Sequence, residues 1–560
     1  MVAEQPIEDW AQVPWRKLEA AVYRLQKRIY RASCRGNSAA VHSLQRLLMK
    51  SKAARTLAVR RVTQDNQGKK TAGVDGVKSV SPTHRPLMVT LLRHPQTIKQ
   101  QPTRRVWIPK PGKKDEKRPL GIPVMLDRAH QALVKLALEP EWEAKFEPNS
   151  YGFRPGRSAH DAIQALFNNT TRKPKYVLDA DIKGCFDNIA HEPLLNKLTT
   201  YPAMRRVVKS WLKAGVMSDG VFTPTNSGTP QGGVISPLLA NVALHGLETA
   251  VHNCHGKQEW EKPELIRYAD DFVVLHPNQA VIDTAKSVVE AWLADMGLTL
   301  KPSKTRIVHT LDPLDGEAPG FAFLGFTVRQ YRVGKYKSRT GRNGRPYGFK
   351  VLITPSKDAT QRHYADLRGI VTSGKMLSQS VLITRLNRVI QGWSRYYRGV
   401  VAKATYNALD NRMFPLLLRW AKRRHRNKNG RWIMHKYWRT VGADRWRFAP
   451  PEGAALAKHL HTRIQRHVKV RGHASPFDGD LLYWGQRLRH HPLRTGRTAV
   501  LLQRQGGACA WCGLLFTDLS QIETDHSDPN GTADLTNLRL LHRHCHDQKT
   551  AAADAAGRYS

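Results

Sequence analysis

Arg267-Tyr268-Ala269-Asp270-Asp271-Phe272-Val273-Val274-Leu275 is the stretch that decides the fold. Two adjacent carboxylates interrupt β-favouring residues, which predicts a hairpin with acids at its tip. A surface turn is the alternative for an isolated pair, because Asp bonds its own nearby backbone. Upstream, a second apolar stretch ends in acids at Asp179 and Asp181. Two strands that deliver carboxylates to one point would form a Mg²⁺ site suited to nucleotidyl transfer by two metal ions.

The composition favours a nucleic-acid partner. The 560 residues include 90 Lys and Arg against 45 Asp and Glu, a formal net charge of +45. A charge of this size repels itself unless a polyanion neutralises it. An anionic membrane is the competing interpretation, but the sequence contains neither an 18-residue apolar run nor an apolar signal core. We therefore expect an intracellular, multidomain protein that binds nucleic acid.

The N-terminal half alternates helical patterns with basic loops. Apolar residues recur at helical spacing between Pro14 and Val62, which predicts two helices with basic outer sides. Residues 104–123 predict a basic hairpin that closes over a triphosphate or, alternatively, is merely solvated. The glycine-rich loop 150–158 carries Tyr151 and Phe153, which either stack on bases or pack inward.

Two further motifs surround the Asp pair. Asp179 and Asp181 share one face of their strand, because side chains alternate with a period of two, and spacing alone does not choose between them. The loop Ser227–Pro237 places Gln231 among glycines, where a backbone can approach a template or nucleotide closely.

Three helices are expected after the central region, and their aromatic residues recur at helical spacing. The expected helices cover Lys357–Val371, Leu377–Val400 and Ala404–Arg426. Helical spacing favours core packing over base stacking for Trp393, Tyr397 and Trp420, and leaves the Arg/Lys face for RNA phosphates.

The final sixty residues indicate a metal site. Cys509-x-x-Cys512 and His542-x-x-Cys545 have the paired spacing of a structural, tetrahedral Zn²⁺ site. Asp525-His526 and Asn537 lie between the two pairs, and His546 follows the second. A neutral imidazole such as that of His526 can accept a proton near physiological pH.

In order and spacing, these motifs resemble the group II intron-encoded reverse transcriptase/maturase family with a C-terminal H-N-H endonuclease domain, over residues 15–555. The resemblance implies a multidomain α+β fold: right-hand fingers, a ferredoxin-like palm, an α-helical thumb called maturase domain X, and a zinc-containing ββα-metal domain. The implied divisions are 1–100 for an N-terminal helical extension and the start of the fingers, 101–330 for fingers and palm, 331–450 for domain X, 451–500 for a basic DNA-binding segment, and 501–560 for the nuclease.

The resemblance also assigns roles to residues of the polymerase. It implies that Asp181 and Asp270 bind Mg²⁺ with Asp271 beside them. It also implies that Asp179 is only part of the strand and not a metal ligand. The residues implied to contact the incoming nucleotide are Lys110 and Arg118 at the triphosphate, Phe186 at the sugar 2′ position and Gln231 on the template side. Lys304 matches the lysine of the block that follows the palm hairpin.

In the nuclease motif, the resemblance implies that His526 is the general base, that Asp525 and His546 hold a divalent ion, expected to be Mg²⁺, and that Asn537 braces the loop. His542 stands where many relatives have cysteine, and the loop after His526 lacks the usual apolar residue. The alternative is a zinc-stapled domain that no longer cuts.

The expected function is an RNA-directed DNA polymerase that binds its group II intron RNA as a ribonucleoprotein, assists splicing, nicks target DNA and copies the intron from dNTPs by target-primed reverse transcription. The alternatives are a non-catalytic intron-RNA-binding splicing cofactor and a host-domesticated reverse transcriptase. We expect a bacterial cytoplasmic or nucleoid location, or an organelle, and no membrane partner.

Overall fold

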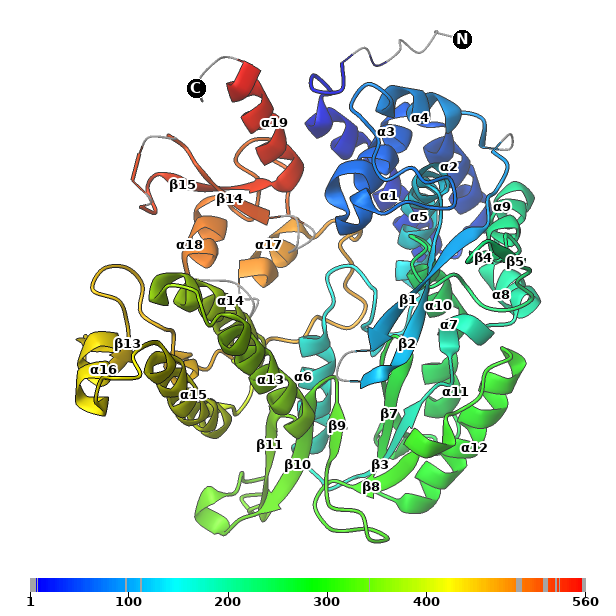
Figure 1. The fold of residues 1–560 in the computed structure, drawn as a ribbon. Coiled ribbons are helices and arrows are strands. Elements are labelled where there is room, and N and C mark those ends of the chain that lie inside the picture. The colour runs from blue at the N-terminus through cyan, green and yellow to red at the C-terminus, as the bar shows by residue number, and fades with distance from the viewer. Residues whose placement is uncertain are drawn as a thin grey trace.

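The structure, a computed structural model, describes residues 7, 9–95, 98–110, 113–341, 343–489, 496–516, 522–528, 531–532 and 534–555. N-terminal helices are followed by a region of sheets with covering helices, a bundle of long helices and a small C-terminal ββα unit (Figure 1). This arrangement confirms the predicted multidomain α+β class. Within the described ranges, the structure contains no helix whose length and apolarity would suffice for a bilayer span.

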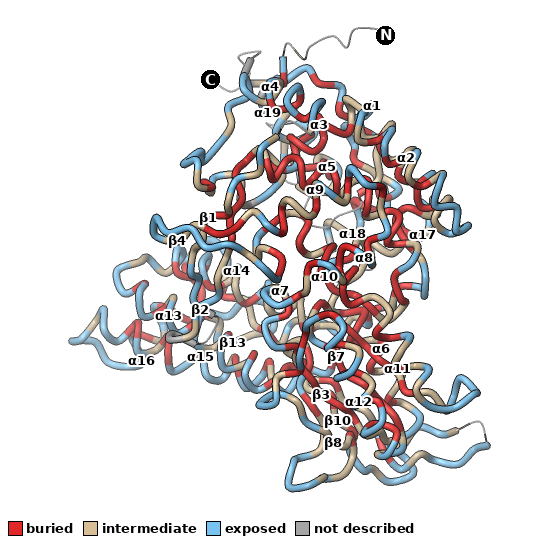
Figure 2. The backbone as a smooth tube through the Cα atoms, turned by 90° about the vertical axis from the view of Figure 1, so that its right-hand side faces the viewer, coloured by how far each residue is buried: buried red, intermediate tan, exposed pale blue. Residues whose placement is uncertain are grey.

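The N-terminal stretch forms three helices, where the sequence predicted two. They are α1 (Trp15–Cys34), α2 (Ser38–Lys50) and α3 (Lys52–Arg60). The additional helix begins at Ser51, whose extended backbone and side-chain acceptor for the Ala54 amide make a helix cap. Apolar spacing does not reveal such a cap. All three helices pack against α5 (Met125–Lys145), which runs through the buried centre of this region (Figure 2).

The predicted basic hairpin is confirmed as β1 (Thr103–Lys110) and β2 (Lys113–Ile122), which pair antiparallel. The hairpin extends into a four-stranded sheet of order β2-β1-β4-β5, in which β4 (Val216–Ser218) runs parallel to β1 and β5 (Val221–Thr223) forms an edge. The Gly121 amide donates a hydrogen bond to the Gln231 carbonyl, 2.5 Å away. This bond ties the hairpin to the loop that carries Gln231.

The central sheet contains the opening stretch of the sequence. Its order is β6-β7-β3-β8, all antiparallel, with β3 (Tyr176–Asp181), β6 (Glu264–Tyr268), β7 (Asp271–His276) and β8 (Arg306–His309). Alternate side chains enter two cores: Leu178 and Val274 pack with α12 (Gln279–Asp295), whereas Val177 and Val273 pack with α6 (Ala159–Thr170). Both faces are thus largely buried, and the strand ends can present polar groups.

Several shorter helices complete the central region. They are α4 (Arg85–Leu91), α7 (Cys185–Asn188), α8 (His191–Leu198), α9 (Pro202–Leu212), α10 (Ser236–Leu244) and α11 (Leu247–His252). A three-stranded sheet of order β11-β10-β9 then leads out of this region through β9 (Phe321–Phe323), β10 (Phe326–Arg332) and β11 (Phe349–Pro355).

Three long helices follow, as predicted: α13 (Lys357–Ser373), α14 (Gln379–Tyr397) and α15 (Lys403–Arg424). Tyr397 and Trp420 are buried, and Trp393 stacks on His363 with ring centroids 4.4 Å apart. The preference for core packing over base stacking is therefore confirmed at these positions. Two smaller elements complete the bundle, α16 (Gly430–Tyr437) and the hairpin β12 (Trp438–Val441) and β13 (Asp444–Phe448).

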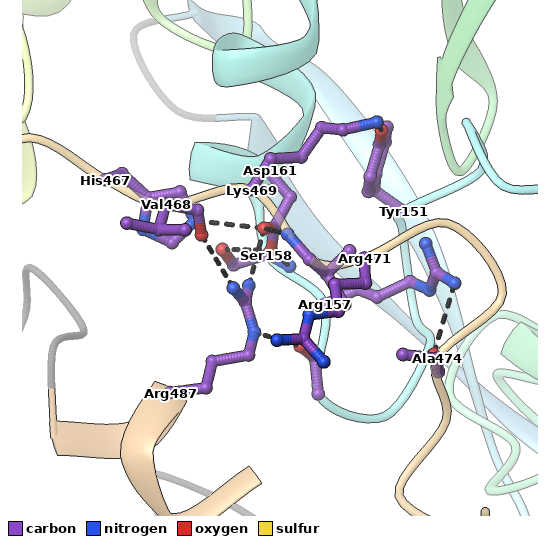
Figure 3. Close-up of polar contacts among 12 residues, drawn as sticks. Tyr151, Arg157, Ser158, Asp161, His467, Val468, Lys469, Arg471, Ala474 and Arg487 are labelled. Carbon is purple, nitrogen blue, oxygen red and sulfur yellow. Dashed lines mark hydrogen bonds and ion pairs between the residues drawn. The ribbon is translucent and has the colours of Figure 1, made fainter. Parts of the chain in front are cut away.

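A long extended segment, residues 462–480, returns from the bundle to the central region. It is held by Asp161, a fully buried carboxylate in the first turn of α6 (Figure 3). Asp161 Oδ1 accepts hydrogen bonds from His467 Nε2 at 3.0 Å, the Val470 amide at 2.8 Å and Arg487 Nη2 at 2.5 Å. Its Oδ2 accepts one from the Ser158 amide at 2.9 Å, which caps α6. Asp161 thus ties this segment to the central region, together with Arg157, whose Nη2 donates to the Gly472 carbonyl at 2.7 Å.

The C-terminal unit consists of α17 (Leu481–Arg489), α18 (Gly496–Arg504), β14 (Ile522–His526), β15 (Leu538–His542) and α19 (Arg543–Ala555). Figure 1 places α19 next to the N-terminal helices. Gln548 Nε2 donates to the Ala11 carbonyl at 2.9 Å, and Arg543 Nη1 to the Asp65 carbonyl at 3.5 Å. The two ends of the described chain therefore pack together. His490 and His491 of the predicted basic segment lie outside the described residues.

Candidate functional site

The predicted hairpin with acids at its tip is formed by β6 and β7. Asp271 begins β7 and lies opposite both Tyr268 of β6 and Asp181, the last residue of β3. Asp270 occupies the turn between the strands, after Ala269 with a left-handed φ of 58°. Asp181, Asp270 and Asp271 therefore meet at one end of the central sheet.

Two residues that the sequence reasoning missed shape this turn. Arg267 is completely buried, and its Nη1 donates to the Ala269 carbonyl and to Asn241 Oδ1, both at 3.1 Å. Gly152 packs so closely that a Cβ on it would lie 2.2 Å from the Ala269 nitrogen. The guanidinium and the glycine fix the left-handed residue that directs Asp270. In the sequence, Arg267 could have been recognised as a basic residue directly before the Tyr-x-Asp-Asp pattern.

The electrostatics of this sheet end favour a bound cation. Removal of solvent by the surrounding protein, with the charges of Asp270 and Asp181, raises the pKa of Asp271 to about 7. Burial, with the charge of Asp181, also raises the pKa of Asp270. Lys304 Nζ lies 2.5 Å from Asp181 Oδ2, and this hydrogen bond raises the pKa of the lysine. Like charges crowded in this way are relieved by a divalent ion, and the oxygen ligands suit Mg²⁺.

Asp179 lies outside this group. Both Nε and Nη2 of Arg306 donate to its Oδ2 at 3.2 Å. Burial raises the pKa of Asp179, and the Arg306 guanidinium opposes that shift. Asp179 lies opposite Val273 within the sheet, whereas Asp181 lies opposite Asp271 at the sheet end, so Asp179 is the weaker candidate for a metal ligand.

A pocket of about 190 Å³ lies between the β1–β2 hairpin and the loop 227–231. Its lining includes Arg105, Phe186, Asp187 and Gln231, and Gln231 Nε2 donates to Asp187 Oδ2 at 3.0 Å. Phe186 and Gln231, which the sequence selected separately, therefore share one pocket.

The two aromatic residues of loop 150–158 have different surroundings. Tyr151 is fully buried, whereas Phe153 is 48% exposed and meets the Phe186 ring edge to face at 6.0 Å. Tyr151 therefore packs inward, and Phe153 remains available beside the pocket.

The predicted triphosphate residues lie on the hairpin. Arg118 is exposed on β2, and its positive charge acts to lower the pKa of Asp270, so the guanidinium and the carboxylate influence each other. Lys110 is the last residue of β1, and its side chain lies outside the described part.

The predicted zinc ligands come together in the C-terminal unit. Cys509, Cys512, His542 and Cys545 are all buried, with their ligand atoms within 4.8 Å of one another. Cys512 Sγ lies 3.3 Å from His542 Nδ1. Three sulfurs and one imidazole nitrogen facing a common point fit a tetrahedral metal ion, and Zn²⁺ prefers this donor set.

The nuclease motif lies on the same ββα unit. His526 ends β14, and Asp525 precedes it with a buried side chain. Asp525 Oδ1 lies 3.5 Å from His546 Nε2 on α19, so the two predicted metal ligands face each other. Asn537 donates to the Asp528 and Thr532 carbonyls, both at 2.9 Å, and thereby closes the loop between the strands.

Three charged residues around Asp525 were not predicted. Lys549 Nζ lies 2.9 Å from both Asp525 oxygens, and Arg539 Nε lies 2.8 Å from one of them. These hydrogen bonds hold the pKa of Asp525 below its usual range, against the opposing effect of burial. Glu523 accepts from His546 Nδ1 at 2.9 Å. The two-residue strand period, which places Glu523 and Asp525 on one face, was the signal for Glu523.

Comparison with protein families matches four parts of the chain. The descriptions and residues are N-terminal domain of reverse transcriptase, 10–92; reverse transcriptase (RNA-dependent DNA polymerase), 108–328; group II intron, maturase-specific domain, 360–438; and HNH endonuclease, 509–552. The first two cover the N-terminal helices and central sheets, the third covers the long helices, and the fourth covers the ββα unit.

Individual relatives agree with these matches. Protein YkfC of Escherichia coli (strain K12) is 31% identical over 367 residues, 58% of this chain and 90% of YkfC. Group II intron-encoded protein LtrA of Lactococcus lactis subsp. cremoris is 40% identical over 173 residues, 30% of this chain and 28% of LtrA. The uncharacterized 91 kDa protein in cob intron of Schizosaccharomyces pombe is 25% identical over 360 residues, 53% of this chain and 43% of that protein.

A reverse transcriptase domain, a maturase-specific domain and an HNH endonuclease domain in one polypeptide define a multifunctional nucleic-acid enzyme. The chain belongs to the group II intron-encoded reverse transcriptase/maturase family. Its catalytic domains are of types that use divalent metal ions, which agrees with the carboxylates gathered at the sheet end and with the Asp525–His546 pair.

Proposed function

We propose that this protein copies its own intron RNA into DNA, with the central sheet as the palm, the β1–β2 hairpin as part of the fingers and helices α13–α15 as the thumb. The observation that carries the proposal is the meeting of Asp181, Asp270 and Asp271 at one end of the central sheet. The pocket lined by Phe186 and Gln231 supports a nucleotide site.

The palm residues divide the work of nucleotidyl transfer among them. Asp181 and Asp270 would hold Mg²⁺, and Asp271 adds negative charge beside them. When bound, two Mg²⁺ ions sharpen the primer 3′-hydroxyl as a nucleophile and neutralise the leaving pyrophosphate. Lys304 neutralises Asp181 through its hydrogen bond, so the metal-free site is not an uncompensated cluster of charge.

The residues around the pocket position the nucleotide. Phe186 presents its ring at the sugar and restricts the space at the 2′ position. Gln231 is held by Asp187 on the template side. Lys110 and Arg118 are proposed to bind the triphosphate, with Arg118 offering a planar fork and Lys110 a point charge.

The C-terminal unit is proposed to nick the target DNA that primes synthesis. His526 removes a proton from water, Asp525 and His546 hold a divalent ion, proposed to be Mg²⁺, and Asn537 braces the loop. A cation that binds Asp525 has to share this carboxylate with Lys549 or displace the Lys549 ammonium from it. Zn²⁺ at Cys509, Cys512, His542 and Cys545 would staple this small unit together.

The excess basic charge suits both nucleic-acid partners. We propose that residues 331–450 bind the intron RNA as a ribonucleoprotein and assist its splicing, and that residues 451–500 contact target DNA. The net charge of +45 supports binding to nucleic acid, and the match of residues 360–438 to a maturase-specific domain supports the role of the first segment. A non-catalytic splicing cofactor would have no need for the three carboxylates at the sheet end.

Primer extension on an RNA template with Mg²⁺ and dNTPs tests the polymerase. Asp270→Ala should reduce the rate at least about 100-fold, because the charge that forms in the transition state loses its support. Asp283→Ala, which removes an exposed carboxylate on α12, is the matched control and should extend like wild type. Extension that survives Asp270→Ala would reject the palm assignment, and absence of extension in wild type would favour the splicing cofactor.

The nuclease is tested separately by His526→Ala on a nicking substrate. Nicking should disappear while primer extension persists. Loss of both activities would indicate misfolding, and retained nicking would reject His526 as the base.

A further inference from the structure

The C-terminal unit contacts the N-terminal helices through more than the two hydrogen bonds described above. Glu19 of α1 lies at the centre of this contact. Its Oε1 accepts a hydrogen bond from Arg60 Nη2 at 2.6 Å and lies 3.2 Å from His544 Nε2 of α19. The Glu19 and His544 side chains are 17% and 3% exposed, so the contact is largely shielded from water.

The same carboxylate lies near the proposed zinc site. One oxygen of Glu19, one ring nitrogen of His542 and one ring nitrogen of His544 all lie within 4.8 Å of one another. His542 is also a proposed zinc ligand, with Nδ1 facing Cys512. The His542 and His544 rings stack with centroids 5.1 Å apart and planes at 13°. Glu19 therefore approaches the metal site through His544, the ring that stacks on the ligand His542, and it does so from a helix outside the nuclease unit.

Arg60 holds Glu19 in this position. Besides donating to Glu19, its Nε lies 3.3 Å from Asp65 Oδ2, and its guanidinium lies 4.7 Å from the centre of the Trp15 ring. The Trp15 ring in turn meets His544 edge to face at 6.4 Å. A carboxylate fixed by a buried guanidinium has little rotational freedom, so its negative charge stays directed at the two histidines.

We propose that Glu19 positions the zinc-binding histidine His542 through His544, because it holds the His544 ring against that ligand. The proposal rests on the zinc ligands proposed above. Groups just outside a metal site orient its ligands and affect how tightly the metal is held. Here the Glu19 carboxylate contacts His544, and the His544 ring stacks on the ligand His542. All four proposed zinc ligands come from the nuclease unit, but Glu19 joins their surroundings only when α1 is docked against α19. Glu19 is thus a positioning residue that links metal retention to the packing of the two units.

The experiment measures zinc release from the full-length, zinc-loaded protein. Excess EDTA removes the metal, or 4-(2-pyridylazo)resorcinol reports its release by colour. Glu19→Gln keeps the size of the side chain and removes its charge, and zinc should leave about tenfold faster or more. Glu19→Asp keeps the charge on a shorter side chain and should give an intermediate rate. Primer extension, which Glu19 does not serve, shows that each variant is folded.

Two control variants distinguish the effect of the Glu19 carboxylate on zinc release from the effects of weaker docking and of altered net charge. Gln548→Ala removes a docking hydrogen bond but leaves Glu19 in place, and Glu290→Gln removes an exposed charge on α12. Both should release zinc at the wild-type rate. If Gln548→Ala releases zinc as fast as Glu19→Gln, or if Glu19→Gln matches wild type, the proposal is overturned.

Metal content distinguishes failure of this proposal from failure of the zinc site. Wild type should contain one zinc ion per chain, and Cys512→Ser should contain none. Two ions per chain would mean that Glu19, His542 and His544 bind a metal themselves, which overturns the positioning role. Wild-type protein that takes up no zinc would instead reject the zinc site, and the role of Glu19 with it.

Discussion

Substituting Asp161 should detach the extended segment 462–480 from the central region. Asp161→Asn preserves the size of the side chain but replaces a carboxylate that accepts from His467, Val470 and Arg487 (Figure 3). The amide oxygen can still accept from these three donors, which all bond to Oδ1, but the NH₂ group would face the Ser158 amide, which donates to Oδ2. The Arg487 side chain, which is 9% exposed, would then lack its counter-charge.

The size of the effect follows from this burial. Breaking a buried ion pair by removing one partner costs about 3–5 kcal/mol. Because the amide oxygen of Asn can still accept hydrogen bonds, we expect a cost at the lower end of this range. A loss of about 3 kcal/mol raises the population in which the segment is detached roughly 100-fold. Hydrogen exchange measures this population locally, which suits a multidomain chain better than a global unfolding free energy.

Hydrogen exchange read by mass spectrometry on peptides from 462–480 is the assay, with Asp283→Asn as the exposed control. In Asp161→Asn, protection of these amides should fall by about the 100-fold given above, while protection in the central strands is unchanged. Equal protection in the variant and wild type would refute the role of Asp161 as the anchor.

The pH dependence provides a second check on Asp161. The hydrogen bonds from His467, the charge of Arg487 and the Val470 amide hold its pKa well below the usual range, despite opposing desolvation. A carboxylate with a lowered folded pKa stabilises the structure fully above its unfolded pKa of about 3.9, and this stabilisation is lost as the pH falls towards the folded pKa. The difference between wild type and variant should therefore be constant near neutral pH and shrink below about pH 4.

Three further predictions concern the metal sites and the turn. Because the pKa of Asp271 is about 7 without metal, protons compete with the cation, and primer extension should need more Mg²⁺ at pH 6 than at pH 8; an unchanged Mg²⁺ requirement would contradict this. Gly152→Ala would place a Cβ 2.2 Å from the Ala269 nitrogen, so extension should fall sharply, whereas Gly334→Ala, with nothing within 4 Å, should be neutral; full activity in Gly152→Ala would show that the turn tolerates displacement. Cys512→Ser should abolish zinc binding and nicking while extension persists, as measured by metal content and both activity assays; zinc content equal to that of wild type would exclude Cys512 as a ligand.

Local patterns predicted much of the fold and the membership of the candidate sites. The alternation of β7 and the acids before it were sufficient to predict the hairpin, because both depend on neighbouring residues. The spacing of Cys509 and Cys512 indicated the metal cluster for the same reason. Gly152 and Arg267 were not recognised, because their roles depend on close packing against a turn elsewhere in the fold.

Long-range partners were the least predictable feature. Asp161 contacts His467 across 306 residues of sequence, and within its own helix it looks like an ordinary capping residue. Glu19 likewise looks like one charge on an amphipathic helix. No spacing rule connects either carboxylate to its distant partner, so only the folded arrangement reveals that each one holds two units together.

The contact between α1 and α19 has a consequence for synthesis on the ribosome. Gln548 is translated 537 residues after its partner Ala11. At 5–20 residues per second, this interval lasts roughly half a minute to two minutes. During that time the polymerase region can fold, but the side of α1 that carries Glu19 has no α19 to cover it. The nascent protein therefore passes through a stage in which a polymerase is present and its nuclease is not yet attached, and docking of α19 is among the last steps of maturation.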